Sequence, residues 1–121
     1  MEPWLIKALM DHAHNVTPYL PPDQWYVAYF LDDVEVDGGD YARQPIDLAA
    51  AEVLLDEVTS ASAIPQFFTG LPTTDVDEVR LMTALTGGVA GYRIPWIHSF
   101  TAGDEWGHAP GKIRAQGSRV A

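Results

Sequence analysis

Apolar and polar residues recur with two different periods along this chain, and the two periods separate one helix from several strands. Near the start, four residues follow the i, i+3, i+4, i+7 spacing of an amphipathic helix: Leu5, Ala8, Leu9 and His12. Pro3 suits the first turn of such a helix, because its missing N–H would have no helical partner there. We therefore predict a helix over residues 3–13. A helix this short is stable only if its apolar side packs on the domain or on a partner.

The pattern after this helix is typical of short β-strands separated by turn residues. Trp25 to Leu31 is an aromatic, β-favouring run that follows Pro21 and Pro22. Val76 to Leu85 alternates with a period of two until Gly87 and Gly88 interrupt it. Both segments are therefore predicted to be strands.

Further strands are expected toward the C-terminus. Tyr92 to Phe100 reads as a strand in which Pro95 removes one hydrogen-bond donor, which favours an edge position or a bulge. Three shorter strands are expected from apolar runs between turn residues: Phe67-Phe68, Glu105 to Ala109 and Lys112 to Ala115. Glu105 to Ala109 is expected to pair back across the Ala102-Gly103-Asp104 turn.

One helix followed by five or more short strands predicts a mainly β fold, either a β-sandwich or an open barrel of antiparallel strands with an N-terminal α-helix. The length of 121 residues suits one modest core. We predict a single domain over residues 1–121. Within it, residues 1–17 are the helix and connector, 18–111 the β domain, and 112–121 a basic C-terminal tail.

The segment after residue 46 has an ambiguous pattern. Asp47 could N-cap a helix whose apolar stripe would contain Leu48, Ala51, Leu55 and Val58. The same residues are also compatible with strands, so the periodicity does not decide between the two.

A run of seven residues, Gly38-Gly39-Asp40-Tyr41-Ala42-Arg43-Gln44, combines a turn, an aromatic side chain and a lone cation. The two glycines supply the positive φ that a tight turn needs. The extended segment after them places Tyr41 and Arg43 on one face. The run is similar to the Gly-Gly-Ser-Tyr-Ala-Arg-Gln run of a family of small virion structural proteins of tailed bacteriophages, described as tail-fibre-like, minor tail or head and decoration proteins.

Other segments resemble that family in the same order. They are the opening helix, the first strand and two later blocks: Leu5 to His12, Pro21 to Phe30, Val79 to Gly88 and Thr101 to Asp104. The resemblance implies a strand from Tyr41 to about Ala49, and another that leads to Phe67 and Phe68. We favour strands for Tyr41 to Leu48 and leave residues 49–58 open between helix and strand.

Two segments depart from the family pattern. Residues 52–60 are richer in aliphatic and acidic residues than the expected Gly/Ser-rich loop. The tail after Gly111 carries Lys112, Arg114 and Arg119, whereas the family tends to a plain apolar strand.

The formal net charge of −10 lies entirely in the first half of the chain. Residues 1–57 contain 12 acids against Lys7 and Arg43, whereas residues 58–121 contain five acids and five bases. This charge opposes contact with nucleic acid, whose phosphates are bound through Lys and Arg. For a virion protein it favours an outward, solvent-facing position or a basic protein partner.

The composition and the lengths of the apolar runs argue against several classes of protein. No run approaches the roughly 20 apolar residues of a membrane span, and Glu2 and Pro3 stand where a cationic signal region would begin. We therefore expect a soluble protein, made in the host cytoplasm and without membrane contact. The absence of cysteine excludes disulfides, thiolate metal sites and cysteine nucleophiles.

The candidate chemical motifs are weak. Asp33-Val34-Glu35-Val36-Asp37-Gly38 has alternate acids like the start of a calcium loop, but Gln44 stands where the closing Glu should be, so an acidic hairpin loop is expected. The four histidines, at positions 12, 14, 98 and 108, have no metal-site spacing and are interpreted as surface or capping residues. The serines lack a Gly-x-Ser-x-Gly elbow. We predict no enzyme activity, no cofactor, and no catalytic, cofactor-binding or metal-binding residues.

These observations predict a phage virion structural protein. The first hypothesis is a capsid-associated decoration protein or head-fibre subunit on the outer surface of the virion. Its expected partners are the major capsid protein or other virion proteins, and it is expected to form a homo-oligomer. The alternative is a tail or baseplate component of tail-fibre type that takes part in host recognition. The candidate interface residues are Trp4, Tyr41, Arg43, Lys112, Arg114 and Arg119.

Overall fold

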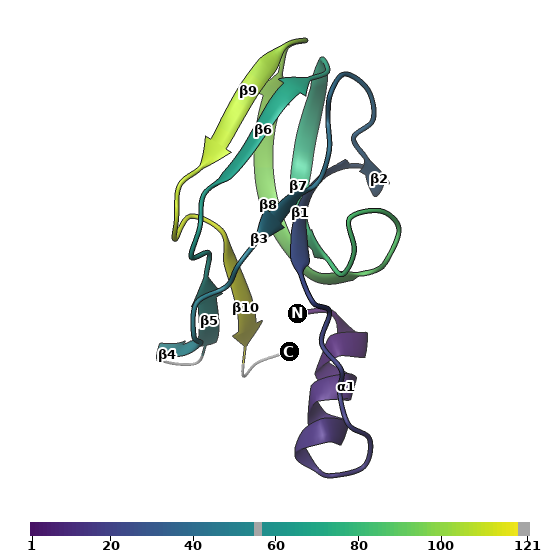
Figure 1. Ribbon diagram of the computed structural model, residues 1–121, viewed down its shortest axis with the longest axis vertical. Helices are drawn as coiled ribbons and strands as arrows, with labels where there is room; N and C mark the ends of the chain where they lie inside the picture. Colours follow the sequence, from purple (N-terminus) through teal and green to yellow (C-terminus); the bar gives the residue numbers. More distant parts are fainter. Residues whose placement is uncertain (55–56, 119–121) are drawn as a thin grey trace.

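The computed structural model describes residues 1–54 and 57–118 (Figure 1). The fold is mainly β, with an N-terminal helix and antiparallel sheets that do not close into a barrel. This confirms the predicted fold class of a β-sandwich or open barrel.

Helix α1 (Pro3–Ala13) has the bounds that the periodicity predicts. It starts where Glu2 N–H donates to the carbonyl oxygen of Gly91 at 2.8 Å. Only Leu5 of this helix is buried. Figure 1 shows α1 projecting from one end of the sheets, with the connector running back along it. The predicted stripe therefore packs on the domain at one position and leaves Leu9 and His12 exposed.

The largest sheet has β1 near its centre. Its strands run in the order β2-β1-β7-β8, with β3 also paired to β1. Their bounds are β1 Trp25–Leu31, β2 Val34–Glu35, β3 Gln44–Ile46, β7 Thr74–Met82 and β8 Ala90–Phe100. Four consecutive residues of β1, Val27 to Phe30, are buried, so side chains cover both faces of this strand. The aromatic run that predicts β1 is thus the central strand of the fold.

Two smaller sheets complete the described part of the chain. One runs in the order β10-β5-β4 and the other pairs β6 with β9. Their bounds are β4 Glu52–Leu54, β5 Glu57–Ala61, β6 Gln66–Leu71, β9 Asp104–His108 and β10 Arg114–Ser118. All the pairings are antiparallel.

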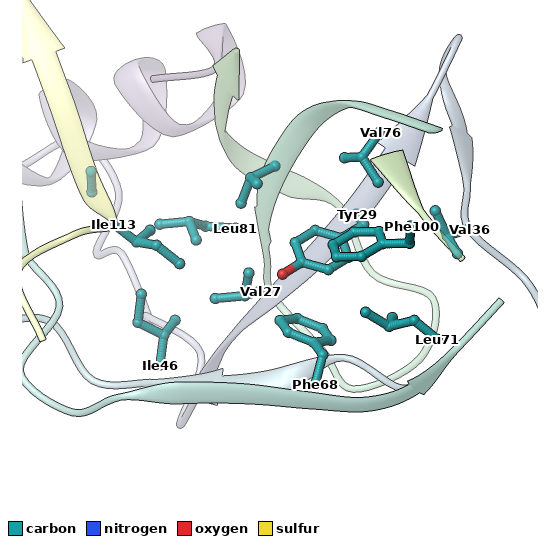
Figure 2. Close-up of a cluster of buried hydrophobic side chains, with 12 residues drawn as sticks. Val27, Tyr29, Val36, Ile46, Phe68, Leu71, Val76, Leu81, Phe100 and Ile113 are labelled. Atoms are coloured by element: carbon teal, nitrogen blue, oxygen red, sulfur yellow. The ribbon is translucent and has the colours of Figure 1, made fainter. Parts of the chain in front are cut away.

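The main core lies between these sheets (Figure 2). The rings of Tyr29 and Phe68 stack with centroids 4.2 Å apart, which joins β1 to β6. Ile113 and Ala115 extend the same core to the last strand. On the other face of β1, the Arg80 guanidinium covers the Phe30 ring at 4.0 Å, a cation–π contact.

Two segments differ from the predictions, and the segment left open between helix and strand contains strands. The strand favoured for Tyr41 to Leu48 is limited to β3 and an isolated bridge between Leu48 and Ser62. The open segment 49–58 contains strand residues in β4 and β5, while residues 55 and 56 lie outside the described part. β9 pairs with β6 instead of pairing back on β8. The chain therefore changes sheets at the turn between β8 and β9.

The predicted basic tail is also part of the β domain. β10 pairs with β5 over Arg114 to Ser118. Ile113 and Ala115 are buried there. A boundary at residue 111 therefore does not separate a tail from the domain.

Candidate functional site

The Gly38–Gln44 run starts with the predicted left-handed turn. Gly38 and Gly39 have φ of 114° and 55°. The turn docks on the end of β6, because Asp40 N–H donates to Gly70 O at 2.7 Å. A side chain at Gly39 would meet that same carbonyl oxygen at 2.3 Å. The second glycine is therefore required by backbone conformation and by close approach.

Tyr41 and Arg43 share one face, as predicted, and both bind Glu35. The Tyr41 hydroxyl donates to Glu35 Oε2 at 2.8 Å. Arg43 makes a two-pronged contact, with Nε on Oε2 and Nη2 on Oε1, both at 2.8 Å. Burial alone would raise the pKa of Glu35, but the hydrogen bonds from Arg43 and Tyr41 outweigh it and hold that pKa below its usual value.

Arg43 also holds the loop between β7 and β8. Its Nη1 donates to the carbonyl oxygens of Ala84 and Gly87 at 2.8 and 2.7 Å. The residue is only 8% exposed. We call Glu35, Tyr41 and Arg43 the clamp, because they join the 38–44 run to β2 and to this loop. The clamp thus engages the polar atoms of Tyr41 and Arg43 in contacts within the fold.

A second cluster joins the large sheet to β9. Tyr29 stacks on Trp96 and Phe100, with centroids 5.4 and 5.6 Å apart. The His108 ring lies edge-on to Trp96 at 5.2 Å. Burial lowers the pKa of His108 to about 4, and the neighbouring His98 adds to this shift. His108 was expected at the surface or at a cap, and its burial corrects that expectation.

A pocket of about 380 Å³ opens beside this cluster. Trp96 and Ile94 of β8 line one wall, and Trp106 and His108 of β9 line the other. Lys112 also borders the pocket. No local spacing in the sequence predicts that these residues meet, because their proximity depends on the pairing of β9 with β6.

A second pocket, of about 420 Å³, contains two predicted interface residues. Lys112 and Arg114 line it together with Met1, Arg93 and Tyr92. The Met1 amine reaches Gln116 O at 3.2 Å. The structure therefore brings Lys112 and Arg114 together with the positively charged N-terminus.

Of the other two predicted interface residues, Trp4 and Arg119, the first belongs neither to the clamp nor to the two pockets described above. Trp4 donates from Nε1 to Ala90 O at 2.7 Å and remains partly exposed. Its indole fixes the base of α1 on β8. Arg119 lies outside the described residues.

Arginine side chains form ion pairs with the acidic loop at residues 33–38, which resembles the start of a calcium loop. Asp33 forms ion pairs with Arg80 and Arg93. Over residues 1–54 and 57–118, no three His, Cys, Asp or Glu side chains are grouped to hold a metal ion. No helix in this part is long and apolar enough to cross a membrane. The accessible chemistry of the two pockets is stacking, apolar burial and positive charge.

No protein-family model and no curated protein matches this chain. The fold defines a mainly β protein with an N-terminal helix and an unclosed sheet arrangement. The resemblance to small virion proteins therefore depends on the sequence motifs. Its strongest motif, the 38–44 run, contributes Tyr41 and Arg43 to the clamp.

Proposed function

We propose that this chain is a structural protein of a tailed-bacteriophage particle that docks on the assembled shell, as a capsid decoration protein or head-fibre subunit. The observation that carries the proposal is a second apolar stripe of α1, on the side of the helix that faces away from the domain. Its members follow the i, i+3, i+4, i+7 spacing and are all exposed: Ile6, Leu9, Met10 and Ala13. Met10 is 54% exposed. Such a stripe on a projecting helix is suited to burial against another protein.

The energetics of α1 support a partner. An isolated helix of 11 residues is marginal in water, and most helix stability in proteins comes from packing of an apolar face. Here the domain buries Leu5 alone from this helix. A protein surface that covers the exposed stripe would supply the missing packing.

Assembly on a lattice makes weak contacts useful. A protein that binds only the assembled shell stabilises it by mass action, and the effect is repeated at every copy. The expected partners are the major capsid protein or other virion proteins, with sister copies meeting as a homo-oligomer on the outer surface. The net charge of −10 supports a solvent-facing position and opposes DNA contact.

The test is binding of purified variants to particles that lack this protein. Met10→Glu places a charge in the stripe and should weaken binding at least tenfold. Val34→Glu adds the same charge to an exposed valine of β2, which lies well away from α1, and should bind like the parent (Figure 1). Equal binding of all three proteins would contradict docking through α1.

Electron microscopy of intact particles separates the two virion locations. Density on the shell, together with lower heat resistance of particles that lack the protein, would support the capsid assignment. Density in the tail or baseplate would favour the alternative, a tail-fibre-like component involved in host recognition. Absence from purified particles would contradict both.

A further inference from the structure

The edge of β8 that faces away from β7 is unpaired over most of its length. β8 pairs with β7 and β10 pairs with β5, and within the described residues no ladder joins β8 to β9 or β10. At one end, Glu2 N–H donates to Gly91 O of β8 and the Met1 amine donates to Gln116 O of β10. The first two residues therefore lie between β8 and β10. Beyond Gly91, no backbone group of the described residues pairs with this edge, so it can accept another strand, except that Pro95 offers no N–H there.

The two pockets described above are neighbours along this edge, and we refer to them together as the groove. Ile94 and Lys112 border both of them. The end near Trp96, Trp106 and His108 is aromatic. The end near Tyr92 carries the cations. Trp96 and Tyr92 are four strand residues apart, which corresponds to about 13 Å.

Among the Lys and Arg side chains of residues 1–54 and 57–118, only those at the basic end include cations that form no ion pair with another described side chain. Four of the Lys and Arg side chains form internal ion pairs: Lys7, Arg43, Arg80 and Arg93. The remaining two, Lys112 and Arg114, both line the groove beside the N-terminal amine. In a chain with a net charge of −10, this concentration favours an anionic partner at that point.

We infer that the groove binds an extended acidic segment of a partner protein by strand addition to β8. The main chain of the segment pairs with the free edge of β8. A bulky apolar side chain enters the Trp96–Trp106–His108 end, and carboxylates about four residues away contact Lys112 and Arg114. Main-chain pairing gives affinity in this mode, and the two pockets give specificity. The inference goes beyond the proposed docking through α1 and does not depend on a phage origin.

The probes are fluorescein-labelled decapeptides with a Thr/Val background. The main probe carries one Trp and, four residues later, two Glu, and a second probe has the reverse order because the strand direction is open. One matched peptide replaces both Glu with Lys, and another replaces Trp with Ala. Anisotropy should give a Kd of about 100 µM or tighter for one acidic Trp peptide, since a single added strand buries little surface. Binding should weaken in 0.5 M NaCl by roughly tenfold, and the Lys peptide should not bind.

Variants and amide signals locate the site. The double variant Lys112→Gln/Arg114→Gln should weaken the acidic peptide at least tenfold, whereas Lys7→Gln, which removes an exposed cation outside the groove, should leave it unchanged. Both altered groove residues are exposed, so an unaltered Tm should accompany the loss. Peptide-induced amide shifts and slower hydrogen exchange should map to β8.

Four outcomes of the peptide experiments would overturn the inference. They are no peptide binding below 1 mM, equal binding of the Lys peptide, shifts centred on α1, and displacement of the peptide by self-association of the protein. Preferential binding of a single-stranded DNA 20-mer would overturn it as well. The peptide assay contains no particles, so its result is separate from the outcome of the Met10→Glu experiment.

Discussion

The hydroxyl oxygen of Tyr29 lies 2.6 Å from Nε2 of His108, although 79 residues separate them in the sequence. Tyr29 is fully buried in β1 and His108 lies in β9. This contact crosses from the largest sheet to a smaller one, so it ties together two layers that share no ladder. Burial raises the pKa of Tyr29 above its usual value, so both partners are neutral near pH 7.

Acid should destabilise the fold through His108. Its pKa falls from 6.5 to about 4 on folding, chiefly because burial disfavours the charged ring. Between these two values the unfolded chain binds the proton more readily, so this contribution is complete above pH 6.5 and is lost as pH falls toward 4. The difference amounts to about 3 kcal/mol. Urea unfolding from pH 7 to pH 4 measures it.

The control for this prediction is His108→Gln, which cannot titrate. Its free energy of unfolding should depend less on pH over that window, whatever its absolute stability. Carboxylates contribute equally to both proteins, so the difference between the two slopes isolates His108. Parallel pH profiles would show that His108 does not cause the acid loss.

The clamp should contribute strongly to stability. Arg43→Gln removes the paired contacts with Glu35 and both hydrogen bonds to the 83–89 loop. Leaving the Glu35 carboxylate without its cation should lower the free energy of unfolding by about 3 kcal/mol. Lys7→Gln is the matched control, because Lys7 is 78% exposed and its pair with Asp11 should contribute less than about 0.5 kcal/mol. Similar costs for both variants in urea unfolding would contradict a structural role for the clamp.

The elements that the sequence predicts best are those whose own pattern decides their structure. The bounds of α1 and β1 agree with the predictions because helical spacing, prolines and an aromatic run mark them. The segment after Asp47 could not be assigned, since its apolar spacing also fits a helix. Pairing of β5 with the distant β10 provides the strand partner there, and that partner is 50 or more residues away in sequence. Local pattern carries no information about such a contact.

In the candidate site, too, local pattern predicts some features and distant contacts decide the others. The shared face of Tyr41 and Arg43 follows from strand geometry, but their partner Glu35 lies across a Gly-Gly turn and was not predicted. An acid and a cation placed on either side of such a turn are a signal that could have indicated the clamp. Burial of His108 depends on the partner chosen by β9, which no local pattern specifies.

Helix α1 should respond very differently to changes at its buried and exposed positions. Leu5 is 1% exposed and lies against Gly91 of β8. Leu5→Ala should therefore cost about 2 to 4 kcal/mol of local stability. Met10→Ala should cost less than about 0.5 kcal/mol, because no core contact is lost in the free protein. Hydrogen exchange of the α1 amides measures both, and equal protection in the two variants would contradict this arrangement.

Gly39 and Gly87 form a matched pair for testing the turn of the 38–44 run. Both have a left-handed φ, of 55° and 64°, so alanine carries a similar backbone cost of about 1 to 2 kcal/mol at each. A Cβ at Gly87 meets nothing within 4 Å, whereas at Gly39 it would lie 2.3 Å from Gly70 O. Gly39→Ala must also push the turn away from Gly70 and break the Asp40 hydrogen bond, so its total cost should be at least twice that of Gly87→Ala. Equal costs in urea unfolding would mean that the close approach of these two backbone segments contributes nothing to the fold.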